Sequence, residues 1–459
     1  MNAYYRKILI FGCAAIFPLS VFAQQKTIRI KDLLTLVQTS QPQMKAYEEQ
    51  AKSSRYGINL AKNTMVPDVN IGYQAGYATY NNITGMSYPG LILPISGPPS
   101  AGNTYDPVPG TAAGAMVKWN PLTFGQRSAA IEKATAQYKL ANSTYNDALF
   151  RQQYAAISVY LDAVYLQKLI QTFQANIDRT NTGLQQSLVF TREGLRPGID
   201  TTQFQAALAQ AKTDLLVAQR QYYAQLSELT RLTGLSDLPE NIWLADTSLL
   251  SQLPQMADTT AGPSGNPVYQ FYRMKKEVTQ SSLKEIERIW RPRLDLWANA
   301  YARGSGVKAD GSVDKADGWS LSRRNYGAGV QISFPILQFS EVRLKKKQYN
   351  ALLKADEAQL DQVTLNLQKQ KETARYSYDQ NMLITKQALV QSQAARYAFE
   401  GLKLSYASGL VDFTRLIQGQ YDLLKAETGE AAAYLQAWRS LLDIAVANGQ
   451  LTTFTDNLK

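Results

Sequence analysis

The chain contains few of the residue types that take part in catalysis or metal binding. The chain contains no histidine and a single cysteine, Cys13. It therefore lacks imidazole bases, has none of the usual zinc or copper ligand sets, and cannot form an internal disulfide. Carboxylates remain, but no acidic cluster suggests a general acid and base. The sequence predicts a protein that is not an enzyme and uses no cofactor or metal. A carboxylate enzyme is the alternative, and it would need two acidic residues converging in a pocket.

The first 23 residues have the pattern of an export signal. Two basic residues precede an apolar stretch over 8–22, and small residues lead up to Ala23 and Gln24. We expect cleavage between Ala23 and Gln24, so that Cys13 is removed with residues 1–23. Lipidation of Cys13 is the alternative, because the three residues before it loosely resemble a lipidation motif.

The chain is basic, with a formal net charge of +11. The basic residues are scattered, which is typical of solvated helix faces, and one tight run covers Lys345 to Lys347. With Arg343 and Arg127 this run follows predicted strands, so contact with phospholipid head groups is an alternative interpretation. No nucleic-acid-reading motif is present, and no nucleic acid partner is expected. No segment after the signal approaches 18 consecutive apolar residues, so no transmembrane helix is predicted there.

Landmarks of the first half recur in the second half at a nearly constant offset of 215 to 225 residues. The pairs are Gln41-Pro42 with Asn266-Pro267, Gly194-Leu195 with Gly409-Leu410, and Gly234 with Gly449. Shared order at a shared offset predicts a tandem duplication of a unit of roughly 200 residues. We expect a first repeat over 24–235, an inter-repeat equatorial segment over 236–265, and a second repeat over 266–459.

Each repeat is predicted to contain two strands and two long helices. Proline-free stretches and heptad spacing predict long helices over 126–192, 200–233, 341–407 and 412–448. In the first repeat the heptad seam runs from Phe204 to Leu232, and in the second from Tyr421 to Ala445. Alternation of apolar and polar residues predicts strands over about 66–80, 114–123, 291–302 and 326–338. The turn-rich stretches Asn81 to Ala113 and Arg303 to Asn325 are expected to be long loops.

The predicted strands suggest a membrane location. Segments of about ten residues with one apolar face and aromatic ends fit strands that cross an outer membrane. A soluble two-sided sheet would alternate equally well, and the chain would then be a periplasmic coiled-coil scaffold or binding protein. Four strands cannot close a barrel, and open edges cannot lie in lipid, so membrane strands would require oligomerisation. Three copies would supply twelve strands.

The chain resembles the TolC family of outer-membrane channels over nearly its whole mature length. The resemblance depends on the Gln41-Pro42 opening, the junction Pro121 to Arg127, and the phrases Thr191 to Leu195 and Tyr406 to Leu410. It implies a mainly α fold with membrane β: a trimeric twelve-stranded barrel continued by a long coiled-coil periplasmic tunnel. It further implies passive efflux or type I secretion through the outer membrane of a Gram-negative bacterium. The partners would be a periplasmic adaptor and an inner-membrane pump of RND, ABC or MFS type.

The resemblance also implies roles for residues near the two helical turns. Gly194, Leu195, Gly409 and Leu410 would lie at the periplasmic tip and contact the adaptor, although the glycines could simply end helices. Asp200 and Arg415, with Gln203 and Gln418 three residues further on, would line the periplasmic constriction. Arg415 departs from the aspartate of well-known members, so Asp200–Arg415 pairs between hairpins could hold the tip shut. Alternatively, Asp200 and Gln203 could form a capping box.

Overall fold

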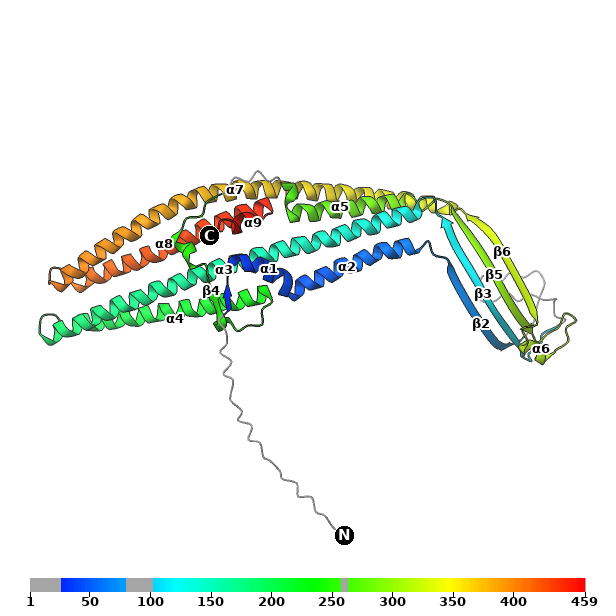
Figure 1. Cartoon of the computed structure of the whole chain (residues 1–459), viewed down its shortest axis with the longest axis horizontal. Coiled ribbons are helices and arrows are strands. Elements are labelled where there is room, and N and C mark those ends of the chain that lie inside the picture. Colours follow the sequence, from blue (N-terminus) through cyan, green and yellow to red (C-terminus); the bar gives the residue numbers. More distant parts are fainter. Residues whose placement is uncertain (1–25, 80–101, 257–262, 459) are drawn as a thin grey trace, which may run out of the picture.

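The structure is a computed structural model that describes residues 26–79, 102–256 and 263–458. The predicted signal peptide, Cys13, the Ala23–Gln24 cleavage site and most of the Asn81 to Ala113 stretch lie outside the described residues. The described chain is strongly elongated, with a sheet at one end and two helical hairpins at the other (Figure 1).

A four-stranded antiparallel sheet forms one end of the molecule. Its strands are β2 (Asp68–Ala78), β3 (Val108–Leu122), β5 (Arg293–Ser305) and β6 (Arg323–Ser333), in the order β2-β3-β5-β6. Each repeat supplies one hairpin, and β3 pairs with β5 to join the two repeats. Strands β2 and β6 are therefore the edges of the sheet.

The register of the sheet separates an apolar face from a polar one. Ile71 pairs with Ala115, which pairs with Ala300, which pairs with Tyr326, and partners in register share a face. The apolar face carries Val69, Ile71, Tyr73, Tyr77, Val117, Leu296, Tyr326, Val330 and Ile332. The opposite face carries Met116, Trp297 and Tyr301 but is otherwise polar or small, with Asn70, Gln74, Lys118, Asp295, Asn299 and Gln331 among its residues. Both faces of β2 and β6 are largely exposed in the single chain.

A layer of four helices continues the sheet in the same order. Helices α2 (Pro42–Asn63), α3 (Gln126–Arg192), α5 (Pro267–Ile286) and α7 (Phe339–Ala407) pack side by side in that sequence. Each one leads into or out of the strand at the same position in the sheet, as Figure 1 shows. Helices α2 and α7 therefore lie at the two edges of the helical layer, just as β2 and β6 lie at the edges of the sheet.

Two antiparallel hairpins form the far half of the molecule. Helix α3 turns back into α4 (Ile199–Thr233), and α7 turns back into α8 (Phe413–Asn448). The hairpins contact one another through α3 and α8, so that α4 and α7 are the outer helices. Side chains of the predicted α4 seam, including Phe204, Ala211, Ala218, Leu229 and Leu232, are buried.

The two hairpins and the helical layer meet around an equatorial core. Short strands β1 (Lys26–Ile28) and β4 (Ile242–Leu244) pair in parallel beside α1 (Ile30–Ser40). The Tyr160 hydroxyl lies 2.9 Å from both the Ile28 carbonyl and the Asp246 carboxylate. The Tyr378 hydroxyl of α7 donates to the Pro254 carbonyl at 2.9 Å. These bonds fasten both repeats to the same buried centre. The remaining short elements are η1 (Pro239–Asn241), η2 (Thr247–Ser251), η3 (Pro263–Gly265) and α9 (Thr452–Thr455).

The repeated sequence landmarks form equivalent contacts in the two halves. Gln41 and Asn266 each cap a helix whose first residue is proline, and each accepts a backbone N–H two residues further on. Gly234 and Gly449 end α4 and α8 with φ of +71° and +74°. A β-carbon on Gly234 would lie 2.7 Å from the Gln41 Cα, and one on Gly449 would lie 2.5 Å from the Asn266 Cα. The same glycine therefore packs beneath the same helix start in both repeats.

Several predicted bounds differ from the structure. Strand β3 begins at Val108, so the last residues of the predicted loop Asn81 to Ala113 belong to a strand. The predicted strand over 326–338 instead begins at Arg323 and ends at Ser333, before Pro335 and the short turn η4 (Ile336–Gln338). The Arg303 to Asn325 stretch is not wholly irregular, because it contains the ends of β5 and β6 and the helix α6 (Lys315–Trp319). In α8, Tyr421 of the predicted seam is exposed, and its neighbour Gln420 is buried instead.

None of the described helices combines the length and apolar character needed to cross a membrane.

Candidate functional site

The tips of the two hairpins are built in the same way. Gly194 and Gly409 follow α3 and α7 with φ of +67° and +80°. In both turns the next residue donates a backbone bond five residues back, from Leu195 to Phe190 at 2.8 Å and from Leu410 to Ser405 at 2.9 Å. These are the bonds of a helix-ending motif that needs a left-handed residue, which explains the glycines.

The leucines after these glycines point away from the chain's own core. Leu195 is 68% exposed and Leu410 is 79% exposed. The glycine that precedes Leu195 has open space around it, because a β-carbon built there would meet nothing within 4 Å. Each hairpin therefore ends in an unpartnered apolar side chain on a sharply turned backbone.

Just behind the tips, a polar cluster joins the two hairpins. The Tyr406 hydroxyl of α7 donates to the Asp200 carboxylate of α4 at 3.2 Å. Arg196, from the first turn, lies over the Tyr406 ring at 5.0 Å and donates to the Val411 carbonyl at 3.1 Å. Tyr406 is 1% exposed and Asp200 is 9% exposed. The contact is thus a buried, charge-assisted link between two hairpins from different repeats.

The environment of the link keeps its donor protonated. Burial, with a further contribution from the Asp200 carboxylate, raises the pKa of Tyr406. A phenol with a raised pKa retains its proton through the physiological pH range. The Tyr406 hydroxyl therefore remains a hydrogen-bond donor in this range.

An aromatic cluster supports the polar one from the side of the helices. The rings of Phe204 and Phe413 are 4.7 Å apart and meet edge to face. Phe204 fits against Gly183, where a β-carbon would lie 2.4 Å from the ring. Gly183 is the single glycine of α3, and its function is to make room for this ring.

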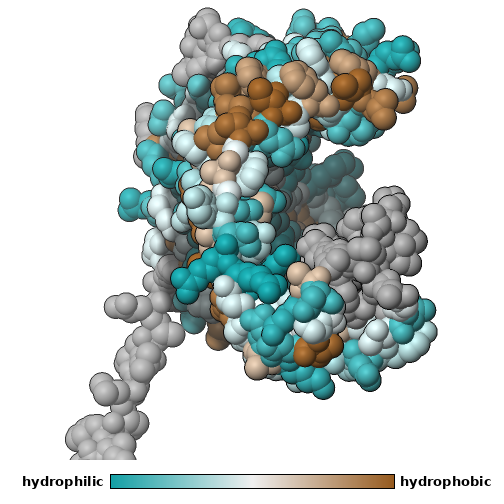
Figure 2. Space-filling view, turned by 90° about the vertical axis from the view of Figure 1, so that its right-hand side faces the viewer, coloured by the Kyte–Doolittle hydropathy of each residue, from teal (hydrophilic) through white to brown (hydrophobic). Residues whose placement is uncertain are grey.

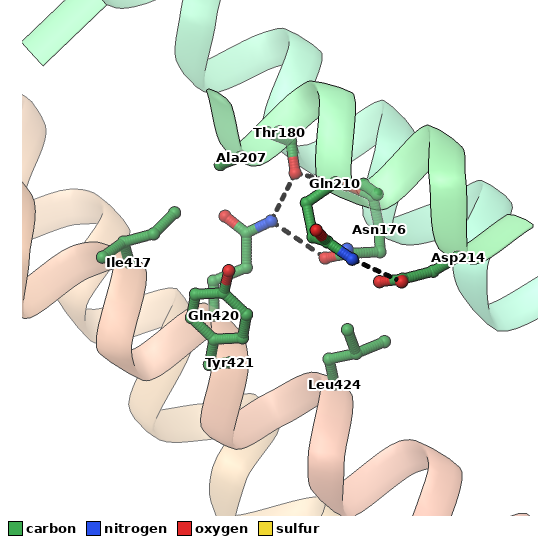
Figure 3. Close-up of a pocket in the computed structure, with 10 residues that line it drawn as sticks. Asn176, Thr180, Ala207, Gln210, Asp214, Ile417, Gln420, Tyr421 and Leu424 are labelled. Atoms are coloured by element: carbon green, nitrogen blue, oxygen red, sulfur yellow. Dashed lines mark hydrogen bonds between the residues drawn. The ribbon is translucent and has the colours of Figure 1, made fainter. Parts of the chain in front are cut away.

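Further from the tip, buried polar side chains continue the contact between α3 and α8. The Gln420 amide donates to Asn176 at 2.9 Å and also to Thr180, as Figure 3 shows. Beyond it, Glu427 accepts from Arg179 at 2.8 Å and from Arg396 at 3.2 Å. The hairpins are therefore joined by successive polar links along their length.

The residues predicted to line a constriction are only partly brought together. The predicted Asp200–Gln203 capping box is wrong, because α4 begins at Ile199 and has no side-chain cap, which places Asp200 inside the first turn. Its carboxylate accepts from Tyr406 instead, and Gln203 is exposed. Within the described part of one chain, Asp200 and Arg415 form no ion pair.

The predicted residues of the second hairpin lie on its surface. Arg415 and Gln418 are exposed on α8. The Arg415 backbone N–H donates to the Asp412 carboxylate at 2.9 Å, so that Asp412 is the helix cap, and Gln418 donates to Asp422 at 3.0 Å. The Arg415 guanidinium is therefore directed to a surface where only a second molecule or solvent could meet it.

Two residues of the cluster were not identified from the sequence. Tyr406 is the first residue of the segment that ends at Gly409 and Leu410. Nothing in that segment indicates that Tyr406 bonds to Asp200, which is 206 residues away. Arg196 follows Gly194 by two positions, and its guanidinium reaches the other repeat only because the hairpins lie side by side. Within the residues that the structure describes, no group of three acidic or cysteine side chains could hold a metal ion.

Comparisons with known proteins agree with this fold. Residues 33–235 match the family model described as outer membrane efflux protein. The chain is similar to the outer membrane protein VceC of Vibrio cholerae, with 14% identity, a TM-score of 0.72, and coverage of 92% of this chain and 96% of VceC. It is similar to the CmeC outer membrane channel of Campylobacter jejuni, with 12% identity, a TM-score of 0.73, and coverage of 92% of this chain and 85% of CmeC. The chain is also similar to a membrane protein from Pseudomonas aeruginosa, with 14% identity, a TM-score of 0.75, and coverage of 92% of this chain and 90% of that protein. No curated protein sequence matches the chain.

Proposed function

Because this chain carries an outer membrane efflux protein domain and has the TolC-like fold, we propose that three copies form a passive export duct. The duct would cross the outer membrane as a twelve-stranded barrel and continue into the periplasm as a helical tunnel. It would receive its cargo from an inner-membrane pump of RND, ABC or MFS type through a periplasmic adaptor. No step of this function makes or breaks a covalent bond.

The observation that carries the proposal is the pair of matching open edges. Among the described residues, β2 and β6 each pair with a strand on one side only, and α2 and α7 continue those same edges. Along α7, exposed apolar residues recur at every seventh position, namely Tyr376, Leu383, Val390, Tyr397 and Leu404. This heptad stripe is directed away from α8, so it needs a helix from another chain. One ring of copies would close the sheet edges and cover the stripe together.

The two faces of the sheet support the same assembly. Its apolar face is suited to lipid, and the face with Asn70, Gln74 and Gln331 is suited to a water-filled interior. Backbone groups at an open edge would each cost several kcal/mol in lipid. Membrane insertion is therefore expected only for the closed ring.

We predict that the mature protein extracted in detergent has the protein mass of three chains. The physical reason is that four strands cannot satisfy their own edges, whereas twelve can close. Light scattering coupled to size-exclusion chromatography measures this mass. A stable monomer, or a protein that salt washing alone releases from membranes, would contradict the proposed function.

At the other end of the duct, the hairpin tips form the proposed adaptor contact and gate. Exposed Leu195 and Leu410 offer an apolar contact to an adaptor, with Gly194 and Gly409 supplying the turn. The Tyr406–Asp200 bond and Arg196 hold the two hairpins of each chain together. We propose that the gate opens when the hairpins part at this cluster. The exposed Arg415 could meet acidic groups of the neighbouring copy in the closed state.

Replacing Tyr406 with phenylalanine should favour the open state of the duct. The change removes the hydroxyl and leaves the buried Asp200 carboxylate without this donor. A hydrogen bond to a charged group contributes about 1.5–3 kcal/mol, so opening should become about tenfold or more favourable. Single-channel recordings in planar bilayers measure the open fraction.

The matched control is Tyr421→Phe on α8, in the same hairpin. Tyr421 is exposed and lies outside the heptad stripe of α7, and its hydroxyl has no hydrogen-bond partner among the described residues, so this variant should behave as the parent. Adding Arg196→Gln to Tyr406→Phe should increase the open fraction further. Equal open fractions for Tyr406→Phe, Tyr421→Phe and the parent would place the gate elsewhere.

A further inference from the structure

The junction between β6 and α7 exposes an uninterrupted apolar stripe. Val330 and Ile332 lie on the apolar face of β6. Phe334 follows the end of the strand and is exposed, and η4 continues with Ile336, which is 70% exposed, and Leu337, which is 94% exposed. Apolar side chains gather in the upper part of Figure 2, the side on which β6 lies in Figure 1. An aliphatic side chain exposed to this degree on a short turn has no packing role within its own chain.

Basic side chains begin within two turns of helix beyond this stripe. Arg343 and Lys347 are exposed and lie one turn apart on the same side of α7. Neither has a hydrogen-bond or ion-pair partner in the described parts of the chain. By contrast, Lys345 pairs with Glu341, and Lys346 pairs with Glu287. Two cationic groups therefore remain uncompensated at this position.

The corresponding junction of the first repeat uses its arginines differently. Arg127, at the start of α3, donates to the carbonyls of Thr64, Asn120 and Pro121. Arg291, from the second repeat, donates to the Phe124 carbonyl of this junction at 2.8 Å. These guanidinium groups hold the strand-to-helix junction together and are not available to a ligand. The free cations of the second junction are thus not a general feature of the repeat.

The spacing of the apolar and basic groups matches the profile of a bilayer surface. Arg343 lies six positions after Leu337, which is about 9 Å along a helix at 1.5 Å per residue. The polar head-group region of a bilayer is roughly 5–8 Å thick on each side, and long basic side chains extend further. A chain whose Leu337 lies at the edge of the hydrocarbon would place Arg343 and Lys347 at the level of lipid phosphates.

We propose that the η4–α7 junction is a binding site for anionic phospholipid in the periplasmic leaflet of the outer membrane. Ile336 and Leu337 contact the acyl chains, and Arg343 and Lys347 bind the phosphate. Continuity with the apolar face of the sheet favours a lipid over a second copy of the chain as the occupant. The proposal rests on the proposed function, because the sheet must lie in the membrane for the site to meet lipid.

Brominated lipids provide a direct test, since bromine quenches tryptophan at short range. Trp290 is half-exposed and lies 5.8 Å from Phe339, at the start of α7, so it reports on this junction. The full-length protein is reconstituted in phosphatidylcholine vesicles containing brominated phosphatidylglycerol or brominated phosphatidylcholine. Subtracting the quenching of a Trp290→Phe variant isolates the share that belongs to Trp290. The parent protein should prefer the phosphatidylglycerol.

The variant Arg343→Gln with Lys347→Gln should lose this preference by up to about 30-fold, since each basic residue near an anionic surface contributes about a fivefold effect. The preference of the parent should also shrink with added salt, because exposed charges are screened. The control, Lys386→Gln with Lys425→Gln, removes two exposed basic residues from the hairpins and should retain the full preference. Added inorganic phosphate should not displace the lipid.

An unchanged preference in the Arg343→Gln, Lys347→Gln variant would overturn the lipid site and leave the proposed function intact. Loss of the trimer mass in that variant would identify the surface as a contact between copies, and would also overturn it. If the parent protein does not remain in the vesicles after an alkaline wash, the proposed function itself fails.

Discussion

Lysine in place of Ile71 should sharply reduce assembly of the protein in the outer membrane. Ile71 lies within two residues of the middle of β2, on the apolar face, and its side chain is exposed in the single chain. If that face meets lipid, a lysine there costs about 2 kcal/mol or more in each chain. The measurement is the yield of folded trimer in outer-membrane fractions, followed by resistance to urea.

The control for this experiment is Gln74→Lys. Gln74 lies on the same strand, one residue from its middle, but on the opposite, polar face. Its replacement adds the same charge to a face that the proposed function places in water, so assembly should remain close to the parent level. Equal behaviour of the two variants would contradict a lipid-facing sheet and favour a soluble one.

Alanine in place of Gly449 should destabilise the folded chain by about 2–4 kcal/mol. Gly449 has a φ of +74°, which costs an alanine about 1–2 kcal/mol. The new methyl group would also lie 2.5 Å from the Asn266 Cα, a backbone atom that cannot move away without shifting α5. Thermal unfolding of the detergent-solubilised protein measures the loss.

Gly429→Ala is the matched control on the same helix. Gly429 lies within α8, and a β-carbon there would meet nothing within 4 Å. Alanine is a better helix former than glycine by about 0.8–1 kcal/mol, so this variant should unfold at a slightly higher temperature. A Gly449→Ala protein that is as stable as Gly429→Ala would refute the contact between the α8 end and the Asn266 cap.

Much of the fold could be predicted because its signals are local and long. A stretch of 67 residues without proline indicates one long helix, and α3 has those bounds. Heptad spacing identifies the buried side of α4 because the helix repeats its environment every two turns. Strand alternation likewise identified both hairpins of the sheet.

The predictions that were wrong concern residues whose usual preference is overridden by their neighbours. Proline is rare inside paired strands, yet Pro109 lies near the start of β3, where its carbonyl accepts the Gly306 N–H at 2.9 Å. Asp200 has the spacing of a helix cap, but the phenol of Tyr406 reaches it from the other repeat. Such contacts depend on how the hairpins pack and leave no trace in the local sequence.

The continuity of α7 has a mechanical consequence for the far end of the molecule. The helix is fixed at the equator through Tyr378 and then runs to Ala407 without interruption. The segment of α7 from Tyr378 to the tip packs along α8, spans 29 residues and is about 44 Å long. A tilt of about 10° around Tyr378 therefore displaces the tip by roughly 8 Å, further than the hydrogen bond between Tyr406 and Asp200 can stretch. A small change of angle at the equator would therefore produce a large displacement at the tip. The proposed adaptor would then not need to pull directly on the bond between Tyr406 and Asp200 in order to break it.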